Sequence, residues 1–324
     1  MAETILQVEN LTMHYITRAG AVSAVDDVSF TLAEGESLGL VGESGCGKTS
    51  VASSLLKLLA DNAQIKGGRI LFKGVDFVPL NEAQMRPYRW RNIAMVFQAA
   101  MNSLNPVYRV GDQIIEALET HLSPYPFEQA RQRVAELFAM VGLDPRLMDQ
   151  YPHEYSGGMR QRAVIAMALA CNPDIIIADE PTTALDVIVQ DTLLRQLQTL
   201  QARIGMSMIY ISHDIAVIAE VSDRIGVMYA GKLVELASAE EIFHQPLHPY
   251  TIALMSAFPS VTGPRRALQT LPGEPPDLLD PPTGCRFHPR CPFASDRCQE
   301  QTPLFQDYGE GHYVACWHPQ EKRV

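Results

Sequence analysis

The sequence of 324 residues lacks several features that define common classes of protein. Basic residues are not in excess: 26 Lys and Arg against 37 Asp and Glu give a net charge of -11. Nucleic-acid binders usually carry a basic face, so no nucleic-acid partner is expected. The longest apolar stretch, Ala163–Ala178, is interrupted by Asn172, Pro173 and Asp174, so no segment is expected to span a bilayer. The N-terminus "MAETILQVENL" has no apolar core of a secretory signal, which favours a cytoplasmic location.

Cysteine is also scarce, and four of the six cysteines lie within the last forty residues. Because cytosolic thiols are kept reduced, this cluster is not expected to form disulfides. The composition, 47% hydrophobic and 19% charged, is ordinary for a soluble globular protein. The length allows one large domain or two moderate ones, each with its own core.

The strongest local signal is "GESLGLVGESGCGKTSVASSLLKLL", in which an apolar strand, Ser37–Val41, precedes Gly42-x4-Gly47-Lys48-Thr49 and a leucine-rich helix. This pattern predicts a phosphate-binding loop in the strand–loop–helix context that it requires. Lys48 would reach the β- and γ-phosphates, and the Thr49 hydroxyl would ligate Mg²⁺. A glycine turn that happens to precede a helix is disfavoured, because the lysine and threonine are in register. The residues expected to bind ATP here are Gly42, Ser44, Gly45, Cys46, Gly47, Lys48, Thr49 and Ser50.

A second signal is "PDIIIADEPTTALD", where the apolar run Ile175–Ala178 ends in Asp179 and Glu180. Such a run predicts a strand buried on both faces of a parallel sheet, and ligands bind at the carboxyl ends of these strands. Asp179 suits a contact to Mg²⁺, and Glu180 suits the base that polarises the attacking water. Two acids that merely end a strand are the alternative. The upstream phosphate-binding loop favours the catalytic interpretation.

Between these motifs lies "YSGGMRQRAVIAMALA", where Ser156 is a good N-cap for a helix whose N-terminus can bind a phosphate. With the motifs in this order, residues 4–250 resemble the nucleotide-binding subunit of an ATP-binding cassette (ABC) transporter. The signature reads "YSGGM" where the family pattern is LSGGQ, so Tyr155 and Met159 depart from it. The methionine removes a polar contact, while the serine hydroxyl and glycine amides are kept. A methionine followed by "RQR" resembles one of the two paired ATPase types of peptide importers.

The resemblance implies a role for each matching residue. Tyr15 would stack on adenine, Gln98 would sense Mg²⁺ and the membrane subunits, and His213 would be the switch histidine near the γ-phosphate. A lone tyrosine or histidine at such positions is also a common structural residue. The catalytic set is Glu180, His213 and Gln98, and the magnesium contacts are Thr49, Gln98 and Asp179. The signature residues that would contact the ATP of a partner subunit are Ser156, Gly157, Gly158 and Met159. Asp186, in "ALD", would lie in the subunit-contact loop.

The resemblance also implies an assembly. In this family each ATP is bound by the phosphate-binding loop of one subunit and the signature of another, and no internal repeat supplies the second half. We therefore expect a second ATPase subunit, either a paralogue in a heterodimer or another copy of this chain. Two integral membrane permease subunits and, indirectly, an extracytoplasmic substrate-binding protein complete the expected partners. The chain would lie peripherally on the cytoplasmic face of the inner or plasma membrane.

The segment "PLHPYTIALM" and the tail containing "GCRFHPRCPFASDRC" resemble the dipeptide and oligopeptide branch of the family. We expect an α/β fold: a P-loop NTPase ABC nucleotide-binding domain over residues 1–258, with a parallel-sheet core, an antiparallel β subdomain and a helical subdomain at about 99–170. A Cys-rich C-terminal extension, residues 259–324, would begin as a proline-rich extended arm. The expected activity is that of a translocating ATPase that energises import of di- or oligopeptides. Import of nickel or oligosaccharides is the alternative, and a non-transport ABC ATPase with a metal-sensing tail is a more distant one.

The tail cysteines, Cys285, Cys291, Cys298 and Cys316, are separated by five, six and seventeen residues. Structural zinc sites usually contain a close C-x₂₋₄-C pair, which is missing here, and free thiols are the plain alternative. Four thiolates can hold a [4Fe–4S] cluster without fixed spacing, and so short a tail needs a staple. Spacing alone leaves iron and zinc open, with the histidines of the tail as possible substitute ligands: His288, His312 and His318. The resemblance to dipeptide-importer tails favours a structural [4Fe–4S] cluster over zinc.

Overall fold

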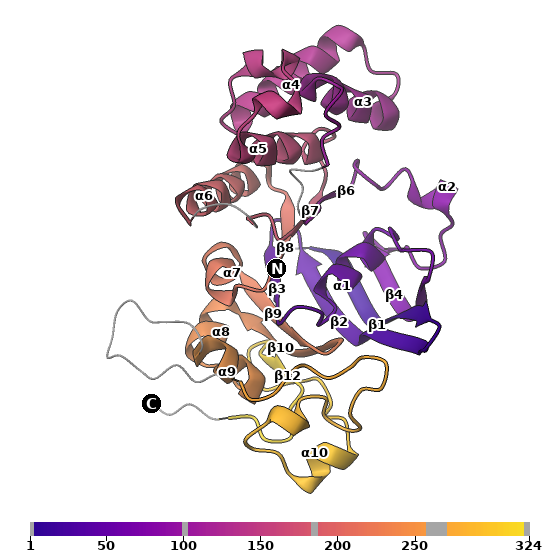
Figure 1. Cartoon of the computed structure of the whole chain (residues 1–324), viewed down its shortest axis with the longest axis vertical. Helices are drawn as coiled ribbons and strands as arrows, with labels where there is room; N and C mark the ends of the chain where they lie inside the picture. Colours follow the sequence, from indigo (N-terminus) through magenta and orange to yellow (C-terminus); the bar gives the residue numbers. More distant parts are fainter. Residues whose placement is uncertain (1–2, 99–102, 183–186, 257–270, 321–324) are drawn as a thin grey trace. The chain divides into compact units, whose positions relative to one another are not determined.

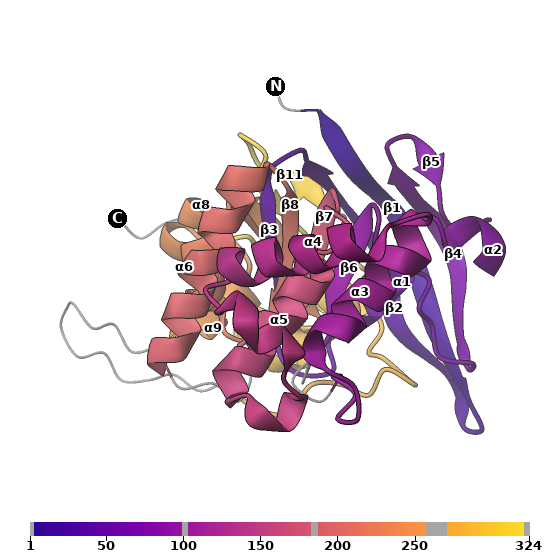
Figure 2. The ribbon, with the colours of Figure 1, turned by 90° about the horizontal axis from the view of Figure 1, so that it is seen from above.

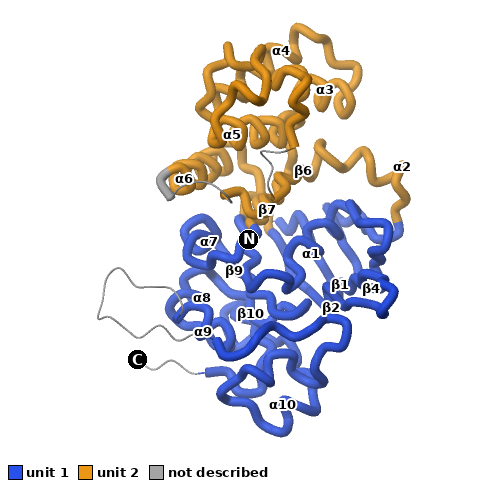
Figure 3. The backbone as a smooth tube through the Cα atoms, in the orientation of Figure 1, with its two compact units in different colours: residues 1–32, 37–79, 211–324 blue, residues 33–36, 80–210 orange. Residues whose placement is uncertain are grey.

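The structure is a computed structural model that describes residues 3–98, 103–182, 187–256 and 271–320 (Figure 1). The chain divides into two compact units (Figure 3). Unit 1 consists of residues 1–32, 37–79 and 211–324, and unit 2 of residues 33–36 and 80–210. The expected subunit-contact loop with Asp186 lies outside the described residues, as does residue 99, where the helical subdomain was expected to begin.

Unit 1 contains the expected antiparallel sheet, and Figure 2 shows its long strands side by side. Its strands, in the order β2-β1-β4-β5, are β2 (Gly20–Ala33), β1 (Thr4–Thr17), β4 (Ala63–Phe72) and β5 (Val75–Asp76). In β1, Leu6 and Val8 alternate with polar residues, but the next core residues, Leu11 and Met13, are in the opposite phase. A register shift around Asn10, whose φ is 49°, restores the phase, so all four side chains are buried.

A second group of unit 1 strands mixes parallel and antiparallel pairs. In order along the sheet they are β11 (Gln306–Asp307), β12 (Tyr313–Val314), β10 (Lys232–Ser238), β9 (Arg224–Tyr229) and β3 (Ser37–Val41). The β3–β9 pair is parallel, as expected, whereas β9 and β10 are antiparallel. The helices of this unit before the tail are α1 (Lys48–Leu55), α7 (Ile215–Val221), α8 (Ala239–His244) and α9 (Pro249–Ser256). The core is therefore a mixed sheet, with the antiparallel strands at one edge.

The C-terminal tail is part of unit 1 and contains little regular structure. From residue 271 to residue 287 it forms no helix or strand, in agreement with the expected extended arm. It then forms a short 3₁₀ turn, η4 (His288–Arg290), and α10 (Asp296–Glu300). Phe287 anchors it, being 1% exposed, with its ring centroid 5.1 Å from that of Tyr229 and 5.5 Å from that of Tyr250.

A buried carboxylate fixes the end of the tail. Glu235 of β10 is fully buried and accepts hydrogen bonds from the backbone N–H groups of Leu247, at 2.6 Å, and His248, at 3.0 Å. Its Oε1 atom also lies 2.7 Å from Nε2 of His312 in the tail. Next to this cluster, β12 pairs with β10 and extends the sheet. One carboxylate thus connects three segments that are far apart in the sequence.

Unit 2 combines a strand layer with a group of helices. Its strands, in the order β8-β7-β6, are β8 (Ser207–Ser212, of which residues 211–212 belong to unit 1), β7 (Ile175–Asp179) and β6 (Ile93–Val96), and β6 and β7 are parallel. Its helices are α2 (Glu82–Met85), α3 (Val110–Leu122), α4 (Phe127–Met140), η2 (Pro145–Asp149), η3 (Pro152–Glu154), α5 (Gly157–Ala168) and α6 (Val187–Ile204). Every residue of β7 is buried, as its uninterrupted apolar run predicts. Within the described ranges, no helix is both long enough and apolar enough to cross a membrane.

Candidate active site

The phosphate-binding loop in unit 1 follows the buried strand β3 and leads into α1. Gly42 has a φ of 152°, and a Cβ atom added there would lie 2.2 Å from the carbonyl oxygen of Met228. At Gly47, where φ is 107°, an added Cβ would lie 2.2 Å from the carbonyl oxygen of Ala24. Neither position can accept a side chain without moving backbone atoms. Both positions therefore require glycine, because the chain turns here with backbone carbonyl groups close on its surface.

Lys48 lies across the inside of this loop. Its side chain is buried, and Nζ donates hydrogen bonds to the carbonyl oxygens of Gly42, at 2.6 Å, and Glu43, at 3.1 Å. Ser44, Gly45 and Thr49 are exposed on the loop. An ammonium group held inside a glycine-rich loop, beside exposed backbone and hydroxyl groups, is suited to binding a polyphosphate.

The two carboxylates predicted to contact Mg²⁺ (Asp179) and to act as the base (Glu180) lie at the end of β7 in unit 2. Asp179 is 1% exposed, and Glu180 follows it with a φ of 48°. Nε2 of Gln98 donates a hydrogen bond to Oε2 of Glu180 at 2.7 Å, so two residues that the sequence places 82 positions apart are in contact. A non-glycine residue in the left-handed region is uncommon and is typical of functional sites.

The signature serine caps a helix, as predicted. Ser156 is exposed, and its hydroxyl accepts a hydrogen bond from the N–H of Met159 at 3.3 Å, at the start of α5. Gly157 and Gly158 form the first turn of this helix and are half-buried. Unit 2 therefore presents a helix N-terminus with the donors expected of a phosphate contact.

Comparison with known families agrees with these motifs. A model of the ABC transporter family matches residues 25–183, and a model described as the oligopeptide/dipeptide transporter C-terminal region matches residues 234–298. The chain is 45% identical to a probable peptide ABC transporter ATP-binding protein, y4tR, of Sinorhizobium fredii, over 99% of this chain and 96% of that protein. It is also 45% identical to the dipeptide transport ATP-binding protein DppD of Bacillus subtilis, over 97% of this chain and 95% of that one. The chain belongs to the ATP-binding proteins of the oligopeptide/dipeptide ABC transporter family.

Further comparisons support the assignment. The oligopeptide transport ATP-binding protein OppD of Escherichia coli is 44% identical, over 99% of this chain and 95% of its own length. Among solved structures, the dimeric ATP-binding cassette MJ0796 bound to ADP and phosphate superposes with a TM-score of 0.65 at 26% identity. This match covers 72% of the present chain and 98% of the other. Because it nearly spans that cassette, the similarity confirms the nucleotide-binding fold.

The unusual first residue of the signature in this ABC protein has a structural explanation. Tyr155 is 3% exposed, and its hydroxyl donates a hydrogen bond to the carbonyl oxygen of Leu147 at 2.7 Å. Burial raises the pKa of this hydroxyl, so Tyr155 remains a neutral donor. The side chain thus packs inside unit 2, whereas Ser156 beside it is exposed.

Two further predicted nucleotide residues belong to unit 1. The hydroxyl of Tyr15, in β1, lies 3.3 Å from that of Ser50 in α1, which places the tyrosine beside the helix that follows the phosphate-binding loop. His213 is exposed and directly follows β8. Cys46 is buried, and this burial raises the pKa of its thiol, with Lys48 opposing the change. The thiol is therefore a packing group of the ABC loop.

The sequence did not reveal one polar contact near Glu180. Gln161 is buried in α5, and its Nε2 donates a hydrogen bond to the carbonyl oxygen of Pro181 at 2.7 Å. Pro181 directly follows Glu180, so this bond ties α5 to the backbone beside the residue predicted to be the base. The only sequence signal was a glutamine within "RQR", and its partner could not be read from that pattern.

Proposed function

We propose that this chain hydrolyses ATP together with a second ATPase subunit and so energises the import of di- or oligopeptides. The family supplies the reaction and the class of cargo, since relatives that match over their full length are named dipeptide or oligopeptide transport ATP-binding proteins. The observation that carries the proposed chemistry is the 2.7 Å hydrogen bond from Gln98 to Glu180 beside the buried Asp179. An amide fixes a carboxylate there, at the end of a buried strand.

The residues of the chain divide the work of hydrolysis. Backbone N–H groups of the phosphate-binding loop and the Lys48 ammonium hold the β- and γ-phosphates, and Tyr15 stacks on the adenine ring. Glu180 orients and polarises the attacking water, and Gln98 keeps its carboxylate in place. We assign His213 to the γ-phosphate. The contacts to Mg²⁺, which neutralises phosphate charge when bound, are assigned to Thr49, Gln98 and Asp179.

The signature implies that two subunits share each ATP. Ser156, Gly157, Gly158 and Met159 offer donors at a helix N-terminus, and we propose that they contact an ATP held by the partner's phosphate-binding loop. The solved cassette MJ0796, bound to ADP and phosphate, is described as dimeric. The partner would be a paralogue or a second copy, and Asp186 would lie at their contact. The assembly would sit on the cytoplasmic face of the membrane, and the division of the chain at residue 258 stays a prediction.

A cavity in unit 2 supports the proposed contact with the permease subunits. Its volume is about 630 Å³, and it is lined along α3 by residues that include Asp112, Glu116 and His121, with Trp90 stacked on His121 at 5.7 Å. Burial lowers the pKa of His121, so the carboxylates dominate the charge of the cavity. An aromatic cavity with an acidic rim suits a short amphipathic permease segment that carries a basic residue.

We therefore expect the double variant Asp112→Asn/Glu116→Gln to lose permease binding. The difference from wild type should be largest at low salt, because salt screens the attraction between exposed charges. The measurement is co-purification with the permease subunits in detergent. Glu128→Gln, which replaces an exposed acidic residue on α4, is the matched control and should retain binding. Equal recovery of the permeases with wild type, with the double variant and with Glu128→Gln would contradict this docking site.

We also propose that the tail cysteines hold a [4Fe–4S] cluster, with zinc as the alternative. All six cysteines of the chain are described, and all are free thiols. Burial, together with the nearby Cys285, Cys291 and Cys298, raises the pKa of Cys316 to about 12, so the four sulfurs lie in one neighbourhood. In the described part of the chain, no group of three or more His, Cys, Asp or Glu is arranged to hold a metal ion. Four cysteine sulfurs are the donors that a [4Fe–4S] cluster requires, and ligation would require these sulfurs to move closer together.

Anaerobic purification followed by iron and sulfide analysis and a visible spectrum tests this proposal. The expected result is a coloured protein with about four irons per chain. Cys291→Ser should lose the iron together with the protease resistance of the tail. The control Cys171→Ser removes a buried thiol in unit 2 and should keep the iron. A colourless protein with one zinc would contradict the cluster.

A further inference from the structure

Glu43, the second residue of the phosphate-binding loop, is held by two segments far away in the sequence. Its backbone N–H donates a hydrogen bond to the Tyr250 hydroxyl at 2.9 Å. Its carboxylate pairs with both terminal nitrogens of Arg290 in the tail, Nη1 to Oε2 at 2.7 Å and Nη2 to Oε1 at 3.1 Å. A bidentate arginine–carboxylate pair fixes orientation as well as charge.

Arg290 is itself held firmly. Its side chain is 6% exposed. Its Nε donates to the carbonyl oxygen of Pro272 at 2.8 Å, and its Nη1 lies 3.3 Å from the Tyr229 hydroxyl. The hydrogen-bonded carboxylate of Glu43 raises the pKa of Arg290, so the guanidinium is always charged. Burying this cation is favourable only while it is paired. The proline-rich arm and the loop are thus joined through one buried cation.

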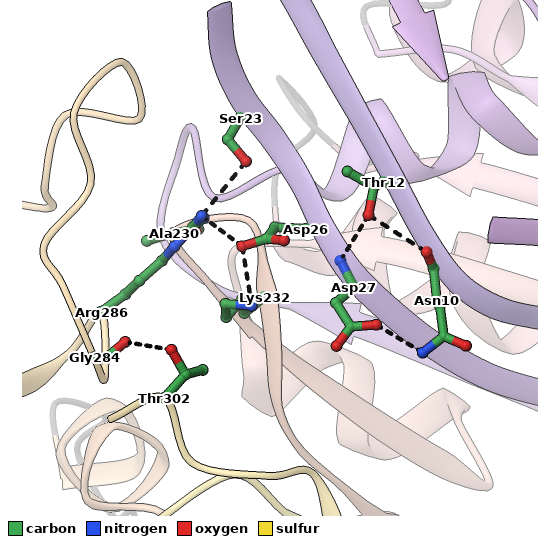
Figure 4. Close-up of polar contacts among 10 residues, drawn as sticks. All are labelled: Asn10, Thr12, Ser23, Asp26, Asp27, Ala230, Lys232, Gly284, Arg286 and Thr302. Atoms are coloured by element: carbon green, nitrogen blue, oxygen red, sulfur yellow. Dashed lines mark hydrogen bonds and ion pairs between the residues drawn. The ribbon is translucent and has the colours of Figure 1, made fainter. Parts of the chain in front are cut away.

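A second tail arginine reaches the loop indirectly (Figure 4). Arg286 pairs with Asp26 at 2.6 Å and donates to the carbonyl oxygen of Ala230, in the turn between β9 and β10. In the same turn, the N–H of Gly231 donates to the carbonyl oxygen of Cys46 in the loop at 2.9 Å. The two arginines, four residues apart, therefore support the phosphate-binding loop at two positions, Glu43 and Cys46.

We propose that Arg290 and Arg286 are positioning residues for the phosphate-binding loop, so that ATP affinity depends on the docked C-terminal extension. The inference rests on the proposed ATP binding. Two effects carry it. Holding Glu43 and Cys46 in advance reduces the ordering that ATP must impose on the loop. Arg290 also neutralises a carboxylate that lies in the loop itself and would otherwise repel a triphosphate.

Substitutions at Arg290 and Glu43 distinguish this positioning role from a merely structural role of the tail. Arg290→Gln should weaken binding of mant-ATP with Mg²⁺ to the full chain by about tenfold, within the roughly 2- to 150-fold range of coupling between contacting residues. The double variant Glu43→Gln/Arg290→Gln should bind more tightly than Arg290→Gln alone, because the repelling carboxylate is gone. Arg290→Lys, which keeps the charge but loses the bidentate fork, should fall between wild type and Arg290→Gln.

The control is Arg297→Gln in the same tail, where Arg297 stacks on Trp317 with its guanidinium carbon 3.4 Å from the ring centroid. This variant should bind mant-ATP like wild type, and thermal melting verifies that each protein is folded. If Arg290→Gln does not fold, the comparison of Arg290→Lys with wild type decides the question. Unchanged affinity in the arginine variants, or a double variant no better than the single one, would overturn the inference alone. A wild-type protein that does not bind mant-ATP would overturn the proposed function as well.

Discussion

Replacing Glu180 by glutamine is expected to stop ATP turnover while leaving ATP binding intact. General-base catalysis accelerates a reaction by about 10²–10⁴-fold, so the rate of ATP hydrolysis should fall by about 10²-fold or more. Glutamine has the same side-chain size as glutamate and is equally strained at a φ of 48°, so the backbone of the site is preserved. Glycine would be a poorer test, because it would also relax this left-handed position. The measurement is phosphate release under saturating ATP, alongside mant-ATP affinity.

The matched control is Glu154→Gln, an exposed carboxylate in unit 2 shortly before the signature. It should hydrolyse ATP at the wild-type rate. Gln98→Ala should lower the rate less than Glu180→Gln, because it removes the amide that orients the carboxylate but not the carboxylate itself. A Glu180→Gln protein that turns over ATP like wild type would show that another residue is the base.

Replacing Glu235 by alanine is expected to destabilise unit 1 strongly. The change removes a fully buried acceptor shared by His312 and two backbone N–H groups. A buried group that loses its hydrogen-bond partner costs about 1–3 kcal/mol of unfolding free energy, and both His312 and the N–H of His248 lose theirs. Urea denaturation measures the loss. Limited proteolysis should also show earlier cleavage of the tail, since His312 loses its partner.

Arg69→Ala serves as the comparison within the same unit. Arg69 is exposed and pairs with Glu9 at 3.5 Å and with Asp76 at 3.4 Å. Exposed pairs contribute about 0–1 kcal/mol, so this variant should unfold almost like wild type. Similar losses in Glu235→Ala and Arg69→Ala would mean that the buried cluster does not anchor the tail.

The sequence predicted the parts of the site that depend on short segments. The four apolar residues that precede Asp179 predicted a buried strand, and the structure contains it. Gly42 and Gly47 were predicted as loop glycines, and backbone carbonyl groups lie where their side chains would be. The apolar run and the positive φ angles of the two glycines are local features, although the carbonyl groups that exclude a Cβ atom belong to the distant residues Met228 and Ala24.

The remaining contacts join residues that no local pattern connects. Arg290 and Glu43 are 247 positions apart, and only the folded unit brings the tail to the phosphate-binding loop. Tyr155 departs from the signature pattern, and the pattern did not show that its hydroxyl would donate a hydrogen bond to Leu147 inside unit 2. The phase change around Asn10 in β1 was equally hidden, because it depends on pairing with β4. These features arise from tertiary packing, and sequence motifs carry no record of their partners.

The central claim is that ATP hydrolysis by this chain drives peptide import, and uptake in a reconstituted transporter tests it most directly. The chain would be assembled with a partner ATPase and permease subunits in vesicles that contain ATP and Mg²⁺, and supplied with a labelled dipeptide or oligopeptide and a substrate-binding protein. We predict accumulation of the peptide that requires ATP and is lost with Glu180→Gln. Peptide uptake that persists unchanged with Glu180→Gln, or ATP hydrolysis that accumulates no peptide, would contradict the account.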